Sequence, residues 1–237
     1  MPASSRFPTT RRSVIRATGS EDSGERRAAW EAVISAYWKP AYKYVRLRWQ
    51  RMPEEAEDLV QGFFALALEK DYFAPYDPSR GTFRTWFRTC LDGYLSHRAA
   101  AWKREKRGGG RVEALDFASA EAELALAAGS TPPSPEECFH REWRRHLFAL
   151  AVEDLRAWCE AEGKQVPFAV FRRYDLAEER SSYDALAAEF GIPATSVTNY
   201  LAAMRRQLRR AVLERLRATT VDAREFEREA RALLGGS

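Results

Sequence analysis

The residues from 183 to 211 restrict the possible folds of this 237-residue chain more than any other stretch. Four apolar residues repeat there at helical spacing: Tyr183, Leu186, Ala187 and Phe190. Gly191 follows them, and glycine commonly closes a helix in the left-handed conformation. After Ile192 and Pro193 a longer apolar stripe begins: Val197, Leu201, Met204, Leu208 and Ala211. The pattern predicts a short helix, a turn of three to four residues and a second helix from about Ala194.

The second of these helices carries a polar and basic face opposite its apolar stripe. The residues that cluster on that face are Thr195, Thr198, Asn199, Ala202, Arg206 and Arg209. DNA-binding helix-turn-helix motifs place the second helix in the major groove, with its first residues at base edges. We therefore expect Thr195, Thr198 and Asn199 to contact bases, and the arginines, Arg205 included, to contact phosphates. An ordinary helical hairpin is the alternative.

The rest of the chain also favours helices. β-branched residues never alternate over five positions, so we find no convincing strand and expect an all-α fold. With 45% hydrophobic and 30% charged residues the chain is globular, and its length suits one large or two small domains. No stretch approaches the ~18 apolar residues of a membrane span, and residues 1–19 lack the apolar core of a secretory signal. Three cysteines without CxxC pairing fit a reducing cytoplasm.

Charge is distributed unevenly along the chain, although the net formal charge is only +4. Residues 98–111 hold six basic residues and one acid, residues 112–137 hold six acids and no base, and residues 205–217 hold six arginines and one acid. We predict a basic N-terminal arm at 1–29, a first helical domain at 30–107, a flexible acidic linker at 108–136, a second helical domain at 137–216 and a C-terminal helical tail at 217–237. This order suits two DNA-binding modules joined by a segment that avoids DNA.

The helix expected after Pro53 carries two stripes of residues. The first is apolar and forms a core face: Ala56, Leu59, Val60, Phe63 and Ala67. The second lies about 100° away around the helix: Glu57, Gln61, Phe64 and Leu68. Acidic and amide groups beside two large apolar side chains favour a docking surface for a partner. The alternative is that Phe64 and Leu68 pack on another helix of the same domain.

A helix predicted from Phe83 to about Lys106 follows a turn-rich loop at 71–81. One side of it is expected to be buried: Phe83, Trp86, Phe87, Cys90, Tyr94 and Ala101. The other side presents Arg84, Arg88, Asp92, Trp102 and Lys103. Basic side chains interleaved with an exposed aromatic suit single-stranded nucleic acid, because bases stack on the ring while the charges hold the backbone. A solvated basic face is the alternative.

Together these segments resemble the bacterial sigma-70 family of transcription initiation factors, of the extracytoplasmic-function type, over most of the chain. Residues 57–64 (EDLVQGFF) resemble the region-two segment that docks on the β′ clamp helices of RNA polymerase. Residues 83–88 (FRTWFR) and the basic run after them resemble the helix that melts the promoter and reads its −10 element. Residues 181–210 resemble the region-four helix-turn-helix that reads the −35 element, and residues 7–13 and 220–222 resemble one subgroup of the family.

The resemblance implies a role for each residue that matches a family motif. Polymerase docking would use Glu57, Asp58, Gln61, Phe64 and Leu68. A flipped −10 base would be pocketed by the loop residues Tyr76, Asp77, Ser79 and Arg80. The non-template strand or the upstream fork would be contacted by Arg84, Trp86, Arg88, Asp92, Trp102 and Lys103. Alanine at Gln61 and Phe64 would then abolish polymerase binding and leave the fold intact.

The same resemblance defines the expected partners and two departures from the family pattern. The partners would be core RNA polymerase, through its β′ and β subunits, and promoter DNA, in a bacterial cytoplasm close to the nucleoid; an anti-sigma factor or other recruiting protein is left open. The acidic linker would lie in a cationic channel of the polymerase. Gly62 replaces the usual acidic residue, and Gly93 stands where an asparagine that contacts the −10 element often lies.

Enzymatic chemistry finds no support in the sequence. Cys138, His140 and His146 lack a recognised zinc spacing, and residues 108–110 lack the context of a phosphate-binding loop. We therefore expect no enzyme, no metal site and no cofactor. Two other classes stay open: a helix-turn-helix regulator that acts without polymerase, which leaves the stripe of residues 57–68 unexplained, and a DNA-processing enzyme such as a recombinase, whose nucleophile or carboxylate cluster we cannot locate.

Overall fold

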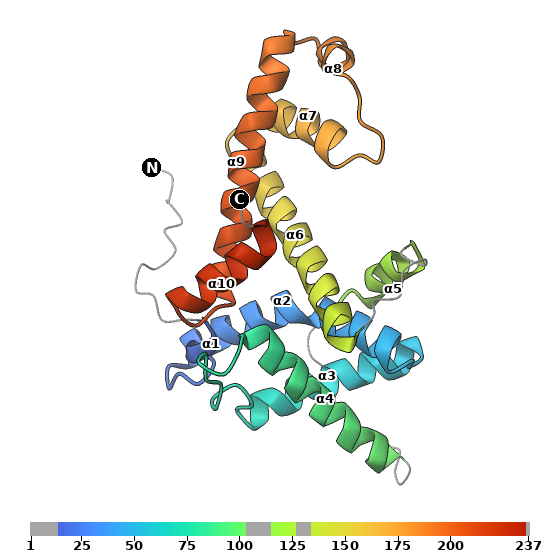
Figure 1. The fold of residues 1–237 in the computed structure, drawn as a ribbon, viewed down its shortest axis with the longest axis vertical. Coiled ribbons are helices and arrows are strands. Elements are labelled where there is room, and N and C mark those ends of the chain that lie inside the picture. The colour runs from blue at the N-terminus through green and yellow to red at the C-terminus, as the bar shows by residue number, and fades with distance from the viewer. Residues whose placement is uncertain (1–13, 103–114, 127–133, 236–237) are drawn as a thin grey trace. The chain divides into compact units, whose positions relative to one another are not determined.

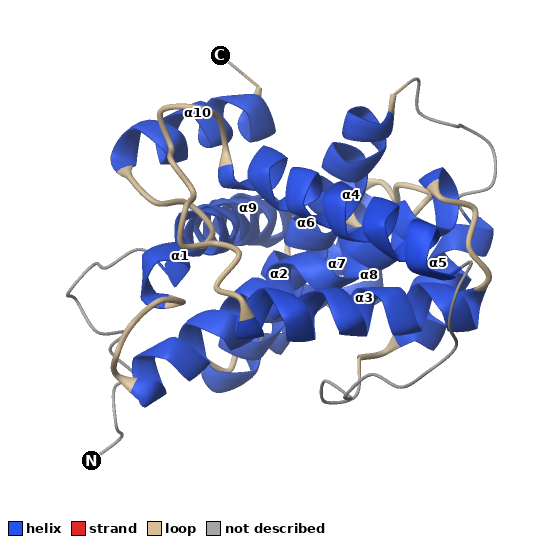
Figure 2. Ribbon diagram, turned by 90° about the horizontal axis from the view of Figure 1, so that it is seen from below, coloured by secondary structure: helices blue, strands red, loops and turns tan. Residues whose placement is uncertain are grey.

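The computed structural model describes residues 14–102, 115–126 and 134–235. Every regular element in these ranges is a helix, as Figure 2 shows, which confirms the all-α prediction. The ten helices are α1 (Val14–Ala17), α2 (Ser23–Arg48), α3 (Pro53–Glu69), α4 (Phe83–Trp102), α5 (Phe117–Leu126), α6 (Pro135–Ala161), α7 (Gln165–Asp175), α8 (Tyr183–Phe190), α9 (Ala194–Ala218) and α10 (Ala223–Leu234) (Figure 1).

The helices belong to two compact units. The first comprises the described residues up to His146 together with those from Leu216 onward, and the second comprises Leu147–Arg215. The first unit therefore contains more than the expected domain at 30–107, because α5, the start of α6 and α10 also belong to it.

Aromatic rings form the core of the first unit. Tyr37 of α2 stacks on Phe87 of α4 with ring centroids 4.5 Å apart. Phe139 of α6 stacks on Phe87 at 5.8 Å, and Phe63 of α3 meets Phe87 edge-on at 5.3 Å. Offset and edge-on pairs add about 0.5–1.5 kcal/mol each beyond the area they bury. The ring of Phe87 on α4 thus contacts rings of α2, α3 and the start of α6 and joins these helices.

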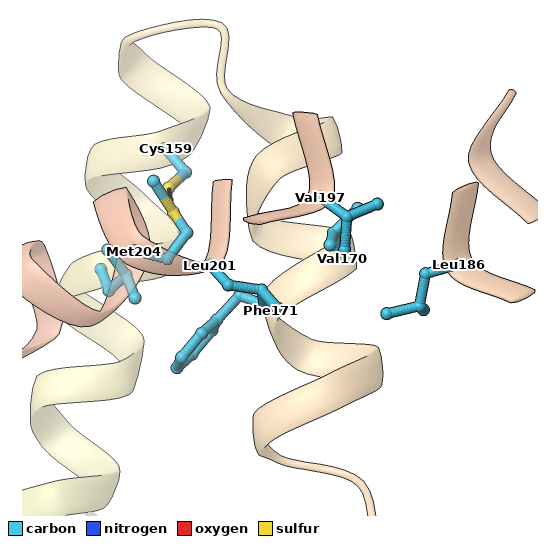
Figure 3. Packing of buried hydrophobic residues seen from close by; sticks show 8 residues of the cluster. Cys159, Val170, Phe171, Leu186, Val197, Leu201 and Met204 are labelled. Atoms are coloured by element: carbon cyan, nitrogen blue, oxygen red, sulfur yellow. Dashed lines mark hydrogen bonds between the residues drawn. The ribbon is translucent and has the colours of Figure 1, made fainter. Parts of the chain in front are cut away.

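Apolar residues of four helices form the core of the second unit. Figure 3 shows side chains of this cluster, whose fully buried members are Leu155, Cys159, Val170, Phe171, Leu186, Val197, Leu201 and Met204. The Ser182 hydroxyl caps α8 by accepting from the Ala185 N–H at 3.1 Å, and Gly191 ends α8 at φ 62° and ψ 37°. A left-handed residue there lets the chain reverse within three residues and start α9 at Ala194.

The described part of the segment expected to be a flexible acidic linker, 108–136, is largely helical. It contains α5, whose carboxylates contact basic residues of α2. The Glu123 carboxylate lies 2.8 Å from Lys39 Nζ and 2.5 Å from Lys43 Nζ, and Glu121 pairs with Arg46 Nε at 2.5 Å. Two carboxylates therefore neutralise a basic face of α2, and the sequence did not reveal this pairing because its partners are about 80 residues away.

His146 makes the stability of the first unit depend on pH. Its Nε2 lies 2.7 Å from the Ser35 carbonyl oxygen, and burial lowers its pKa from about 6.5 to about 4. The unfolded chain therefore binds the proton first as pH falls, so stability present above pH 6.5 is lost progressively down to about pH 4. At about 1.4 kcal/mol per pH unit the loss is roughly 3 kcal/mol.

The measurement is chemical unfolding across this pH range for wild type and His146→Gln, alongside an NMR titration of the ring. Glutamine can keep a donor for the Ser35 carbonyl but does not titrate. The difference in unfolding free energy between the two proteins should change between pH 6.5 and 4 and stay flat above it. An imidazole of His146 that titrates near 6.5 in the folded protein contradicts this account.

No helix in the described ranges is both long enough and apolar enough to cross a membrane.

Candidate functional site

The stripe of α3 that was predicted to dock on a partner includes Phe64, and the structure buries this residue. Its side chain is only 1% exposed, and its ring lies 5.5 Å from Phe63 and 5.8 Å from Phe87, centroid to centroid. A side chain packed in this way cannot contact a partner without opening the core. The assignment of Phe64 to direct docking is therefore wrong, and the alternative of packing on a helix of the same unit holds for it.

The rest of the stripe stays at the surface. Asp58 is exposed, Glu57 and Gln61 are half-buried, and Leu68 is 41% exposed. The pKa of Glu57 is raised by burial and by the nearby carboxylates Glu54, Asp58 and Glu121. The exposed part of α3 is thus an acidic face with one apolar side chain at its end, a surface that suits a basic partner.

Gly62 lies where the hydroxyl of Tyr94 on α4 approaches α3. A Cβ atom at position 62 would collide with that hydroxyl oxygen. Glycine in a helix interior normally costs about 1 kcal/mol relative to alanine. Here the missing side chain makes room for Tyr94, whose hydroxyl in turn accepts from Arg98 Nε at 3.2 Å.

The loop before α4 presents part of the predicted −10 surface. Asp77, Ser79 and Arg80 are exposed. The Asp77 carboxylate accepts from the Ser79 N–H at 2.9 Å, a contact that lowers the pKa of Asp77. Tyr76 is half-buried and its ring packs edge-on against Phe83 at 5.3 Å.

The predicted DNA-contacting side chains of α4 lie in different environments. Arg84 is largely buried over the ring of Trp143, 4.7 Å from its centroid. Arg88 and Asp92 pair with each other at 2.7 Å, and the Asp92 carboxylate also accepts from Tyr44 Oη at 2.9 Å. Asp92 therefore supports the packing of α2 against α4, a role that the sequence did not suggest. The side chain of Trp102, and Lys103 as a whole, lie outside the described residues.

A surface cavity of about 740 Å³ lies between the end of α3 and α4. Its lining combines aromatic and basic residues: Tyr72, Trp86, Tyr94, Lys70, His97 and Arg98. Gly93 also lines it, and a Cβ atom there would meet nothing within 4 Å. Glycine at position 93 thus leaves the cavity wider than a larger residue would, and the cavity wall offers both stacking surfaces and positive charge.

The tail helix α10 contacts the loop before α4 and the first residues of α4. Glu225 Oε1 accepts from Tyr76 Oη at 2.7 Å and from the Phe83 N–H at 2.6 Å. Glu229 pairs with Arg84, Nη2 to Oε2, at 3.2 Å. The sequence analysis did not identify these two contacts with predicted site residues. The spacing of four between Glu225 and Glu229, which puts them on one face of the tail helix, was the available signal.

The predicted base-contacting face of α9 is accessible over most of its length. Thr195, Thr198, Asn199, Arg206 and Arg209 are exposed, and Ala202 is half-buried. Arg205 differs, because its guanidinium donates two hydrogen bonds to the Asp175 carboxylate, at 2.8 and 2.9 Å. Arg205 is thus paired within the second unit, while its side chain stays 48% exposed; its contact with a phosphate remains a prediction.

The described residues contain no group of three or more histidine, cysteine or carboxylate side chains placed to hold a metal ion. Cys90, Cys138 and Cys159 are free thiols, and burial raises the pKa of Cys90 and Cys138 to about 11. Thiols of this kind are poor nucleophiles at neutral pH.

No family model matches this sequence, and no curated protein and no solved structure matches it either.

Proposed function

We propose that this protein is a transcription initiation factor of the sigma type, which binds core RNA polymerase and directs it to promoters. The observation that carries the proposal is the exposed polar and basic face of α9, which follows α8 after a turn closed by Gly191 in the left-handed conformation. A helix-turn-helix needs this order, and it needs the first turns of its second helix uncovered so that they can enter a major groove.

The first unit supplies the support for promoter opening. Its cavity between α3 and α4 combines aromatic walls with Lys70 and Arg98, and unstacked bases bind such surfaces by stacking and charge. The exposed loop residues Asp77, Ser79 and Arg80 lie at the positions that resemble the −10 base pocket of the sigma family. A protein of this design captures bases while the polymerase performs the chemistry.

The test of the proposal is transcription in vitro with purified core RNA polymerase on a library of random promoter sequences. The proposal expects defined start sites that depend on this protein. If no start site appears, with or without an added recruiting partner, the sigma function is refuted.

The face of α9 predicts two distinguishable effects on DNA binding. Asn199→Ala should change the base preference at one or two positions, at about 1–3 kcal/mol per contact. Arg206→Ala should weaken binding to all DNA sequences by a similar factor. It should also reduce the slope of log affinity against log salt concentration by about one. Arg156→Ala removes an arginine of the same unit on α6 and serves as the control. Equal loss at every sequence for Asn199→Ala would show that Asn199 reads no base.

The second candidate is a helix-turn-helix regulator that binds duplex DNA without docking on polymerase. The burial of Phe64 favours it, because that burial removes one of the two large apolar side chains from the expected docking surface. Co-purification with core polymerase separates the two functions. Binding to polymerase that is lost on Asp58→Arg supports the sigma function, and sequence-specific duplex binding by a protein that never retains polymerase supports the regulator.

A further inference from the structure

Glu225 is a buried carboxylate whose oxygens are fully occupied by neighbours in the first unit. The residue is 1% exposed. Its Oε1 accepts from Tyr76 and from the first N–H of α4, at Phe83, and its Oε2 accepts from the Val221 N–H at 2.7 Å. The start of a helix leaves backbone N–H groups without partners inside the helix, and it favours a negative charge. Glu225 therefore ties α10 to the loop and to the beginning of α4.

A second carboxylate extends this contact by one helical turn. Glu229 is 4% exposed and lies against Arg84, which also hydrogen bonds to Glu229 Oε1 at 3.3 Å. Arg228 of the same helix donates to the Pro78 carbonyl oxygen at 3.4 Å. The contacts of α10 thus run from the loop before α4 to the first turn of α4 itself.

The side chains that α10 engages belong to the surface assigned to the −10 strand. Tyr76 and Arg84 both have predicted roles in holding unstacked promoter bases. We propose that α10 is a built-in cover of this surface, held closed by Glu225 and Glu229, and that single-stranded DNA and α10 compete for it. The inference rests on the proposed function, because that function assigns the surface to DNA.

A buried polar group in the contact between α10 and α4 lacks a hydrogen-bond partner among the described residues, which suits a cover that has to open. This group is the Nε of Arg84. Burial raises the pKa of Glu229 and lowers that of Arg84, so each charge is held at a cost that its partner offsets. A DNA phosphate can replace a carboxylate at Arg84 without leaving the guanidinium unpaired.

The test uses the full chain and two kinds of variant. Glu225→Gln with Glu229→Gln removes the charges, and Glu225→Asp with Glu229→Asp keeps them but shortens both side chains by one methylene. Glu227→Gln changes a carboxylate of the same helix whose side chain is 65% exposed, and is the matched control. The aspartate double variant keeps both negative charges, so tighter DNA binding by it reports the release of α10 and not a gain of net positive charge near Arg84.

Two readouts are taken on each protein. Hydrogen exchange of the α10 amides reports whether the cover has opened, and fluorescence anisotropy with a labelled random-sequence single-stranded oligonucleotide reports its dissociation constant. If the cover is closed in about nine of ten molecules, its release tightens binding about tenfold. We expect that change, with faster exchange of α10, in both double variants and in neither wild type nor Glu227→Gln.

Two results would overturn the cover. One is α10 amides that stay protected in both double variants, because the carboxylates then do not hold it. The other is exposed α10 with unchanged affinity for the oligonucleotide. If the same proteins still direct core polymerase to start sites, either result leaves the sigma function standing. Tighter oligonucleotide binding by proteins that direct no start site would support the cover and refute the sigma function.

Discussion

Replacing Phe64 by alanine is expected to lower the free energy of unfolding of the first unit by about 3–5 kcal/mol. The ring is 1% exposed and packs against Phe63 and Phe87, so its removal deletes buried apolar surface and leaves a cavity. A loss of this size is a large part of the total stability of a typical domain. Urea unfolding of wild type and variant, monitored by circular dichroism, measures it.

Leu68→Ala is the control on the same helix. Leu68 is 41% exposed, so its truncation should change the unfolding free energy by no more than about 0.5 kcal/mol. If Phe64→Ala binds less polymerase, the decrease is compared with the decrease in the fraction of folded protein. A Phe64→Ala protein that unfolds like wild type but no longer binds polymerase would return Phe64 to the docking surface.

Lys43→Met is expected to destabilise the first unit by about 3 kcal/mol. Lys43 is a buried cation on α2, 4% exposed, and its Nζ lies 3.3 Å from the carboxylate of Glu142, which is 2% exposed. Removal of one member of a buried ion pair leaves the other charge uncompensated. Glu142 keeps contacts with Arg141 and Arg145, at 3.2 and 3.1 Å, and these limit the loss.

The comparison that isolates this effect is the double variant Lys43→Met with Glu142→Gln, measured by the same unfolding experiment. Neutralising Glu142 removes the uncompensated charge, so the double variant should be more stable than Lys43→Met alone. Lys70→Met removes a surface lysine that pairs with Glu69 and should leave the unfolding curve unchanged. A double variant that loses as much as the sum of both single changes would show that the two charges do not interact.

The periodic parts of the chain were predictable from the sequence because one residue pattern determined both helix and core. Pro53 begins α3, Gly191 ends α8, and the predicted stripe residues Val197, Leu201 and Met204 are buried in the second unit. Local spacing is enough for such features, since each helix has one face that must be covered.

The sequence did not reveal two kinds of contact: ion pairs and hydrogen bonds between residues far apart in the chain, and the packing of the second stripe of α3 against another helix. The spacing of Phe64 places it on a second stripe of α3 but does not say whether another helix covers that stripe. The pairings of Glu123 and Glu225 were not predictable, because their partners Lys43 and Tyr76 lie 80 and 149 residues away. Such pairings depend on how the helices assemble, and no local pattern encodes that.

The position of α10 also has a consequence for the newly made protein. A ribosome synthesises Tyr76 long before Glu225, and at about 5–20 residues per second the 149 residues between them take about 7–30 s. During that interval the contacts of α10 with Tyr76 and Arg84 cannot form. Every newly made chain therefore spends some seconds with Tyr76 and Arg84 lacking these two partners, before any other molecule has acted on it.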